Sequence, residues 1–105
     1  MPVWLLLVGA VTMEVIGTTA LKLSDGFTRL WPSVIVVAGY GLAFIALGQV
    51  LRRMEVSVAY AVWAGLGTAM VAVVGVVFFG EAMSWVKAGS LLLIITGLVG
   101  LNLAG

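Results

Sequence analysis

The sequence contains no cysteine and no histidine among its 105 residues. Without cysteine the chain can form neither a disulfide nor a thiolate metal site. Without histidine it lacks the most common general base, metal ligand and near-neutral pH switch. We also find no nucleophile–base pair, so the sequence predicts neither an enzyme nor a metal site, and its net charge of +1 without a basic run argues against nucleic acid as a partner.

Charged residues are scarce as well. They make up 9% of the chain, whereas 64% of the residues are hydrophobic, and a soluble domain has about 25% charged residues. A bilayer core requires roughly 20 apolar residues per spanning helix, and the charges leave four such stretches. The sequence therefore predicts an all-α membrane protein, residues 1–105 forming one transmembrane domain with spans at about 3–21, 32–51, 56–80 and 85–104.

The short connections between the spans predict antiparallel neighbouring helices. The first and third connections then share one side of the membrane and carry Lys22, Arg29 and Lys87, whereas the second carries Arg52 and Arg53. The positive-inside rule gives almost no preference for this balance. Such a chain can insert in both orientations, although a weak bias that suffices for one orientation is an open alternative.

Glu14 is the one acidic residue inside a predicted span. A carboxylate in the bilayer costs several kcal/mol, and such residues usually mark an ion or substrate path. The alternative is a protonated glutamic acid that hydrogen-bonds a neighbouring helix. No basic residue lies deep within any span, so an ionised Glu14 requires a proton or a bound cation from outside the chain.

Helical spacing predicts which residues share a face with Glu14, because positions three and four apart are neighbours. The first span then presents one stripe, formed by Trp4, Leu7, Ala10, Glu14, Gly17 and Thr18. Aromatic pairs occur at the same spacing in the next two spans, namely Tyr40 with Phe44 and Tyr60 with Trp63. Aromatic faces attract organic cations, although either pair could serve packing alone.

Glycine and other small residues suggest two further features. Gly65 and Gly67 follow Trp63 and could let the third span bend, or let another backbone approach. The fourth span carries small residues, including Ser90 and Gly97, in the pattern of a membrane dimer face. Four short helices can hardly enclose a water-accessible cavity, whereas a homodimer would provide eight helices and two acids.

Several blocks of the sequence resemble the small multidrug resistance family of membrane transporters. They are EVIGTT at 14–19, GFTRLWPS at 26–33, AYAVWAGLG at 59–67 and the ending at 97–102. The resemblance covers nearly the whole chain.

The resemblance implies a proton-coupled antiporter, without a cofactor, that exports hydrophobic cations, often aromatic or quaternary ammonium, across the bacterial inner membrane. It implies an antiparallel homodimer of dual topology in the lipid bilayer. The residue roles that it implies are a shared proton and substrate site at Glu14, a pocket shaped by Tyr40, Tyr60 and Trp63, a helix bend at Gly65 and Gly67, and dimer contacts at Ser90 and Gly97. Trp4 and Ser90 depart from the family pattern, in which we expect tyrosine and glycine.

Two alternatives remain at this point. The guanidinium-exporting branch of the same family typically has a tryptophan shortly after the glutamate and a lysine near the end of the fourth helix, where this chain has Gly17 and Asn102. A membrane subunit that assembles with a larger partner, without transporting anything itself, would also have apolar spans and small-residue faces. It would not explain an unpaired Glu14 beside aromatic residues.

The balanced loop charges predict dual topology. Reporter fusions at the C-terminus should be active on both sides of the membrane, because neither set of loops carries enough excess Lys and Arg to fix the orientation. Two or three lysines added to one set of loops should bias the chain to a single orientation. Insertion of the unmodified chain in one orientation only would contradict the antiparallel homodimer.

Overall fold

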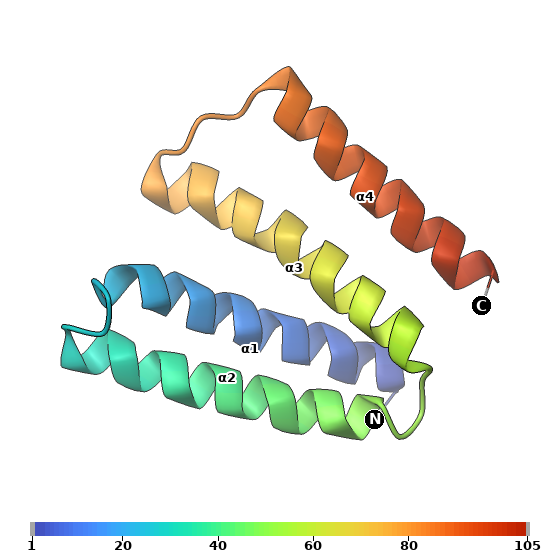
Figure 1. Ribbon diagram of the computed structural model, residues 1–105, viewed down its shortest axis with the longest axis horizontal. Coiled ribbons are helices and arrows are strands. Elements are labelled where there is room, and N and C mark those ends of the chain that lie inside the picture. The colour runs from blue at the N-terminus through green and yellow to red at the C-terminus, as the bar shows by residue number, and fades with distance from the viewer. Residues whose placement is uncertain (1, 105) are drawn as a thin grey trace.

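The computed structural model describes residues 2–104 as a chain of four helices (Figure 1). The helices are α1 (Val3–Leu23), α2 (Leu30–Val50), α3 (Val56–Phe79) and α4 (Trp85–Ala104). Each has 20 to 24 residues and a mean hydropathy of 1.7 to 2.2 over its most apolar stretch. All four are therefore long and apolar enough to cross a bilayer, and the chain is an all-α, multi-pass membrane protein.

The helix ends differ from the predicted spans by one or two residues. α1 continues to Leu23, and α2 begins at Leu30, so Pro32 is the third residue of its helix and not the first. Proline is tolerated there because the first-turn N–H groups have no acceptor within the helix. α3 ends one residue early because Gly80 adopts a left-handed conformation, with φ of 66°, and Glu81 N–H donates to the Gly75 carbonyl at 3.0 Å.

The helices form a hairpin, a crossing helix and an outer helix (Figure 1). α1 and α2 lie side by side and antiparallel, α3 crosses α1, and α4 lies against α3 on the outside of the molecule. The buried core consists of aliphatic side chains at the contact of α1 with α2 and α3, namely Leu7, Val11, Val15, Val50 and Ala59. α1 is thus the central helix, and side chains on it are positioned by two neighbours.

Glycines bring α1 and α2 into very close contact. A Cβ atom added at Gly39 would lie 3.0 Å from the Met13 carbonyl oxygen and 3.2 Å from the Gly17 Cα atom. Both neighbours are backbone atoms of α1, which cannot move without shifting the helix. The two glycines therefore set the distance between the helices.

α4 is exposed along its length. None of its residues is buried, and it contacts α3 through the Leu98 side chain, which lies over Gly65. An apolar helix with so little contact leaves most of its surface for lipid or for another protein chain.

The glycine contact predicts a selective loss of stability. Gly39→Ala should lower the free energy of unfolding by about 1–3 kcal/mol, because the new methyl group overpacks the contact with α1. Gly41→Ala is the matched control on the same helix, because a Cβ atom there meets nothing within 4 Å. Unfolding of the purified variants in detergent measures the difference, and equal stability of the two variants would show that the contact relaxes freely.

Candidate functional site

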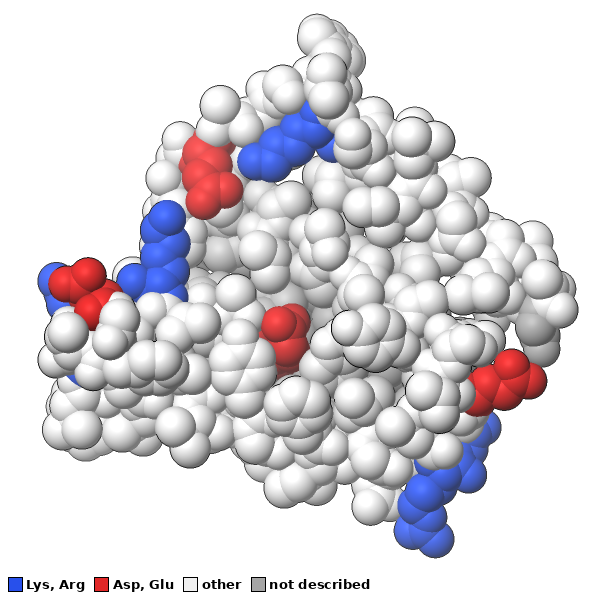
Figure 2. Space-filling model, in the orientation of Figure 1, with Lys and Arg blue, Asp and Glu red and all other residues white. Residues whose placement is uncertain are grey.

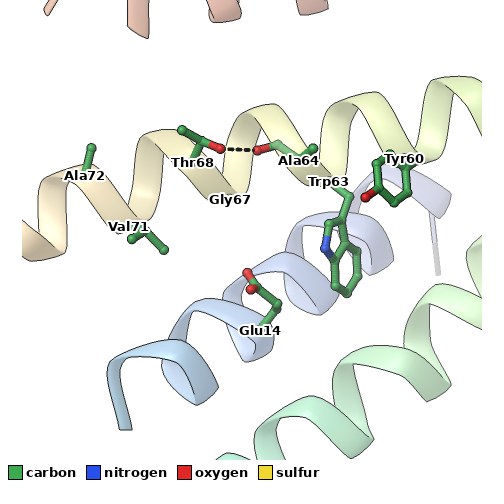
Figure 3. A pocket seen from close by; sticks show the side chains of 8 residues that line it. All are labelled: Glu14, Tyr60, Trp63, Ala64, Gly67, Thr68, Val71 and Ala72. Carbon is green, nitrogen blue, oxygen red and sulfur yellow. Dashed lines mark hydrogen bonds between the residues drawn. The ribbon is translucent and has the colours of Figure 1, made fainter. Parts of the chain in front are cut away.

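A cavity of about 500 Å³ lies between α1 and α3, and Figure 3 shows the side chains around it. Glu14 is its lining residue from α1, and the others come from α3: Tyr60, Trp63, Ala64, Gly67, Thr68, Val71 and Ala72. This volume is in the usual range for small-molecule sites. No lysine or arginine lines the cavity, so its one ionisable carboxyl group faces an aromatic and aliphatic wall.

The charges of the molecule are otherwise concentrated at the ends of the helices. Figure 2 shows basic and acidic side chains gathered at two ends of the visible face, with a single acidic side chain in its middle. Glu14 is the only acidic residue within the four helices, since Asp25, Glu55 and Glu81 lie in the connections. It is partly buried, about halfway along α1.

One oxygen of Glu14 is bonded to the Thr18 hydroxyl, which is bonded in turn to the Tyr40 hydroxyl. The Thr18 hydroxyl donates to Glu14 Oε1 at 3.0 Å, and the Tyr40 hydroxyl oxygen lies 2.6 Å from Thr18 Oγ1. Thr18 has a single hydroxyl proton, and it donates this proton in the hydrogen bond to the carboxylate. Thr18 therefore accepts from the Tyr40 hydroxyl, which is the donor of the second bond. A chain of two hydrogen bonds therefore connects α2 through α1 to the carboxylate.

The other oxygen of Glu14 faces α3. A Cβ atom at Gly67 would lie 3.4 Å from Glu14 Oε2, so the absence of a side chain there leaves room for the carboxylate at the cavity wall. Figure 3 shows the carboxyl group pointing from α1 towards α3. Oε1 is thus held by the protein, while Oε2 is directed to the cavity.

The cavity has an aromatic wall formed by Trp63 and Tyr60 of α3. The Trp63 ring descends from α3 towards α1 (Figure 3), and Phe44 of α2 stacks on it with ring centroids 6.2 Å apart and 18° between the planes. Tyr60 also lines the cavity and is 66% exposed. A carboxylate near an indole face is a suitable environment for an organic cation.

The other residues of the predicted α1 stripe lie away from this cavity. Leu7 and Ala10 are buried between helices, and Trp4 is 43% exposed near the start of α1. Gly17 faces Tyr40, since a Cβ atom added at Gly17 would lie 3.4 Å from the Tyr40 ring. The stripe is wider than the part of α1 that the cavity uses, because α2 and α3 cover its two sides.

Of the residues predicted for bending and dimer contact, Gly67 lines the cavity and the others lie outside it. Gly65 accommodates Leu98 of α4, and α3 is a continuous helix through Gly65 and Gly67. On α4, the Ser90 hydroxyl donates to the Val86 carbonyl of its own helix, and Gly97 has open space beside it. A bend and a dimer contact stay predictions.

Four cavity residues of α3 were not predicted from the sequence, namely Ala64, Thr68, Val71 and Ala72. Spacing could have found them, because residues 60, 64, 68 and 72 are four apart, as are 63, 67 and 71. Their small or aliphatic side chains carry no chemical signal of their own. Within residues 2–104, no three acidic side chains converge on a metal site.

The chain is similar to one protein family and to several of its individual members. The chain matches the family described as Small Multidrug Resistance protein over residues 2–94. It is 49% identical over 100 residues to the quaternary ammonium compound-resistance protein QacF of Klebsiella aerogenes, covering 95% of this chain and 91% of the relative. It is 48% identical over 101 residues to the nicotine metabolites export pump subunit NepA of Paenarthrobacter nicotinovorans, covering 96% and 87%.

A third relative is the multidrug resistance protein Mmr of Mycobacterium tuberculosis, 44% identical over 104 residues, with 98% of this chain and 97% of the relative covered. The similarity therefore extends over all four helices, including the segment that carries Glu14 and the aromatic residues. This chain belongs to the small multidrug resistance family.

Proposed function

We propose that the protein is a multidrug exporter of the bacterial inner membrane, which exchanges hydrophobic organic cations for protons at Glu14. The observation that carries the proposal is the Glu14 carboxylate itself, held on one oxygen by Thr18 and directed by the other into an aromatic cavity without basic residues. The relatives are named for resistance to quaternary ammonium compounds and to multiple drugs, which supports the same class of substrate.

The environment of Glu14 accounts for exchange by competition. An ionised carboxylate in an apolar region needs a counter-charge, and the cavity offers none from its own side chains. A proton satisfies that need by neutralising the carboxylate, and an organic cation satisfies it by pairing with the charge. The two cannot use the same carboxylate at once, so entry of one promotes departure of the other.

The cavity favours bulky apolar cations over guanidinium. Guanidinium is small and strongly hydrated, and burying its donors without acceptors is costly. Besides Glu14, the side chains of the lining offer as acceptors only the hydroxyl oxygens of Tyr60 and Thr68. Quaternary ammonium, phosphonium and dye cations lack such donors and gain from contact with Trp63 and Tyr60. Gly17 stands where the guanidinium branch is expected to have a tryptophan, and a side chain there would contact the Tyr40 ring, because a Cβ atom at Gly17 would lie 3.4 Å from it.

A second copy of the chain is part of this proposal. One chain leaves α4 uncovered and the Glu14 cavity open to one side. An antiparallel copy would cover both and bring a second Glu14 to the site. The state open to one side of the membrane and the state open to the other would then be the same structure with the roles of the two subunits exchanged. NepA is named as a pump subunit, so pairing with a different chain is the alternative to a homodimer. Dual-topology reporters and purification of the single chain distinguish the two kinds of dimer.

Proton release on substrate binding tests the mechanism. Adding tetraphenylphosphonium to the purified protein in weakly buffered detergent should release protons, because the cation displaces them from Glu14. Glu14→Gln should abolish both binding and release, whereas Glu55→Gln, which removes a carboxylate at the start of α3, should retain both. Binding without proton release at any pH near neutrality would disprove the exchange, and guanidinium transport without tetraphenylphosphonium binding would disprove the substrate class.

The hydroxyl of Thr18 predicts a second measurable effect. Thr18→Val should weaken tetraphenylphosphonium binding at fixed pH by about ten- to a hundredfold, because a hydrogen bond to a charged group contributes about 1.5–3 kcal/mol. Thr12→Val is the control, since the Thr12 hydroxyl donates only to the Val8 carbonyl of its own helix. Isothermal titration measures both variants. Equal affinities would show that Thr18 does not support the charged form.

A further inference from the structure

A second, smaller cavity of about 80 Å³ adjoins the first along the groove between α1 and α3. Val71 lines both cavities, and Thr18, which holds Glu14, lines the second. Its other lining residues are Thr19, Lys22, Val74, Gly75, Phe79 and Glu81. On α1 the groove follows positions 14, 18 and 22, so its two ends are about 12 Å apart along the helix. The groove thus leads from Glu14 towards the end of the membrane span.

The ammonium group of Lys22 lies at the far end of the groove. The Lys22 ammonium nitrogen lies 3.9 Å from Glu81 Oε2 and 5.0 Å from the centroid of the Phe79 ring. A carboxylate combined with an aromatic face within about 6 Å is the chemistry of a cation site. It is also the chemistry that Glu14 and Trp63 provide at the first cavity.

The backbone positions the Glu81 carboxylate in this groove. Gly80 turns the chain at the end of α3 through its left-handed conformation, and Glu81 then folds back over Gly75. A methyl group at Gly75 would collide with the Glu81 carboxylate. The other carboxylate oxygen, Oε1, lies 3.9 Å from the Lys87 ammonium nitrogen. The missing side chain at position 75 therefore gives the Glu81 carboxylate its place, where it lies between the ammonium groups of Lys22 and Lys87.

Lys22 is the most exposed charged residue of the group. Its side chain is 59% exposed, and its ammonium group is held by one ion pair at 3.9 Å and by the Phe79 ring. An exposed ion pair of this kind contributes little to stability. A flexible four-carbon stem lets the ammonium group leave the site for water at small cost.

We propose that Phe79 and Glu81 form an outer binding site for the ammonium head group of an organic cation, and that Lys22 occupies this site when no substrate is there. The proposal rests on the proposed function, because it gives the exported cation a second position on its path from Glu14 to water. A cation that arrives displaces the Lys22 ammonium group, and Lys22 returns when the cation leaves.

The tethered lysine gives this site a low net affinity. Any cation must compete with an ammonium group that is covalently attached and always nearby. Lys22 thus prevents the cation from remaining at Glu81, while the carboxylate still compensates its charge during passage. The volume of about 80 Å³ beside Lys22 suits a head group and not a whole dye molecule, so the apolar part of the substrate stays in the groove.

Binding of phenyltrimethylammonium to variants without the inner carboxylate tests the outer site. In Glu14→Gln combined with Lys22→Met, the cation should bind and its N-methyl protons should show nuclear Overhauser effects to the Phe79 ring. Glu14→Gln alone should bind about tenfold more weakly, because Lys22 competes. Adding Glu81→Gln to the double variant should reduce binding by a similar factor, whereas adding Glu55→Gln should not.

Absence of binding to the folded double variant, or binding that Glu81→Gln leaves unchanged, would overturn the outer site. If the double variant does not fold, Lys22→Met with Glu14 intact decides the question. Saturating cation should then contact both the Trp63 and the Phe79 rings. Contacts to Trp63 alone would overturn the outer site and leave the proposed function standing, whereas contacts to neither ring would overturn the proposed function as well.

Discussion

The need to keep a carboxylate in an apolar region is the constraint on which the rest of this structure depends. Glu14 lies halfway along a membrane-spanning helix, and the chain gives it a hydroxyl group but no positive charge. Water would satisfy the group in a soluble protein, whereas here the Thr18 hydroxyl, itself bonded to Tyr40, replaces part of that water. The chain therefore stabilises the group in part, and the exchange that we propose uses the remaining requirement for a counter-charge.

Small residues make this arrangement possible, and each of them has a different neighbour. Gly39 and Gly17 bring α2 close enough to α1 for Tyr40 to reach Thr18. Gly67 gives the Glu14 carboxylate its space against α3, and Gly75 does the same for Glu81. Tyr40, Glu14 and Glu81 are thus placed by positions that lack a side chain, so substitution of these glycines affects hydrogen bonds and ion pairs as well as packing.

Composition and helical spacing were sufficient to predict four spans and to single out Glu14, because long apolar stretches and one interior acid are unambiguous signals. Helix ends were less accurate, since Pro32 is tolerated inside the first turn of α2. Periodicity placed Leu7 and Gly17 on the face of Glu14, but it does not say which neighbour covers each part of that face. Spacing places Ala64 and Thr68 on the face of Tyr60, and Val71 on the face of Trp63, but only the crossing of α3 over α1 shows that these faces line the cavity. The Lys22–Glu81 pair joins residues 59 positions apart, which spacing cannot reveal.

The hydrogen bonds from Tyr40 to Glu14 have a direction, and that direction depends on the occupant of the site. With an ionised carboxylate, the Tyr40 proton points to Thr18 and the Thr18 proton points to Glu14. A proton placed on Glu14 Oε1 makes the carboxyl group a donor, and Thr18 must then accept from it and donate to Tyr40. The Tyr40 proton is left to turn away from α1 and find another acceptor. A proton on Oε1 thus reverses the direction of both hydrogen bonds and is felt on α2 without movement of a heavy atom, whereas a proton on Oε2 or a bound organic cation leaves their direction unchanged.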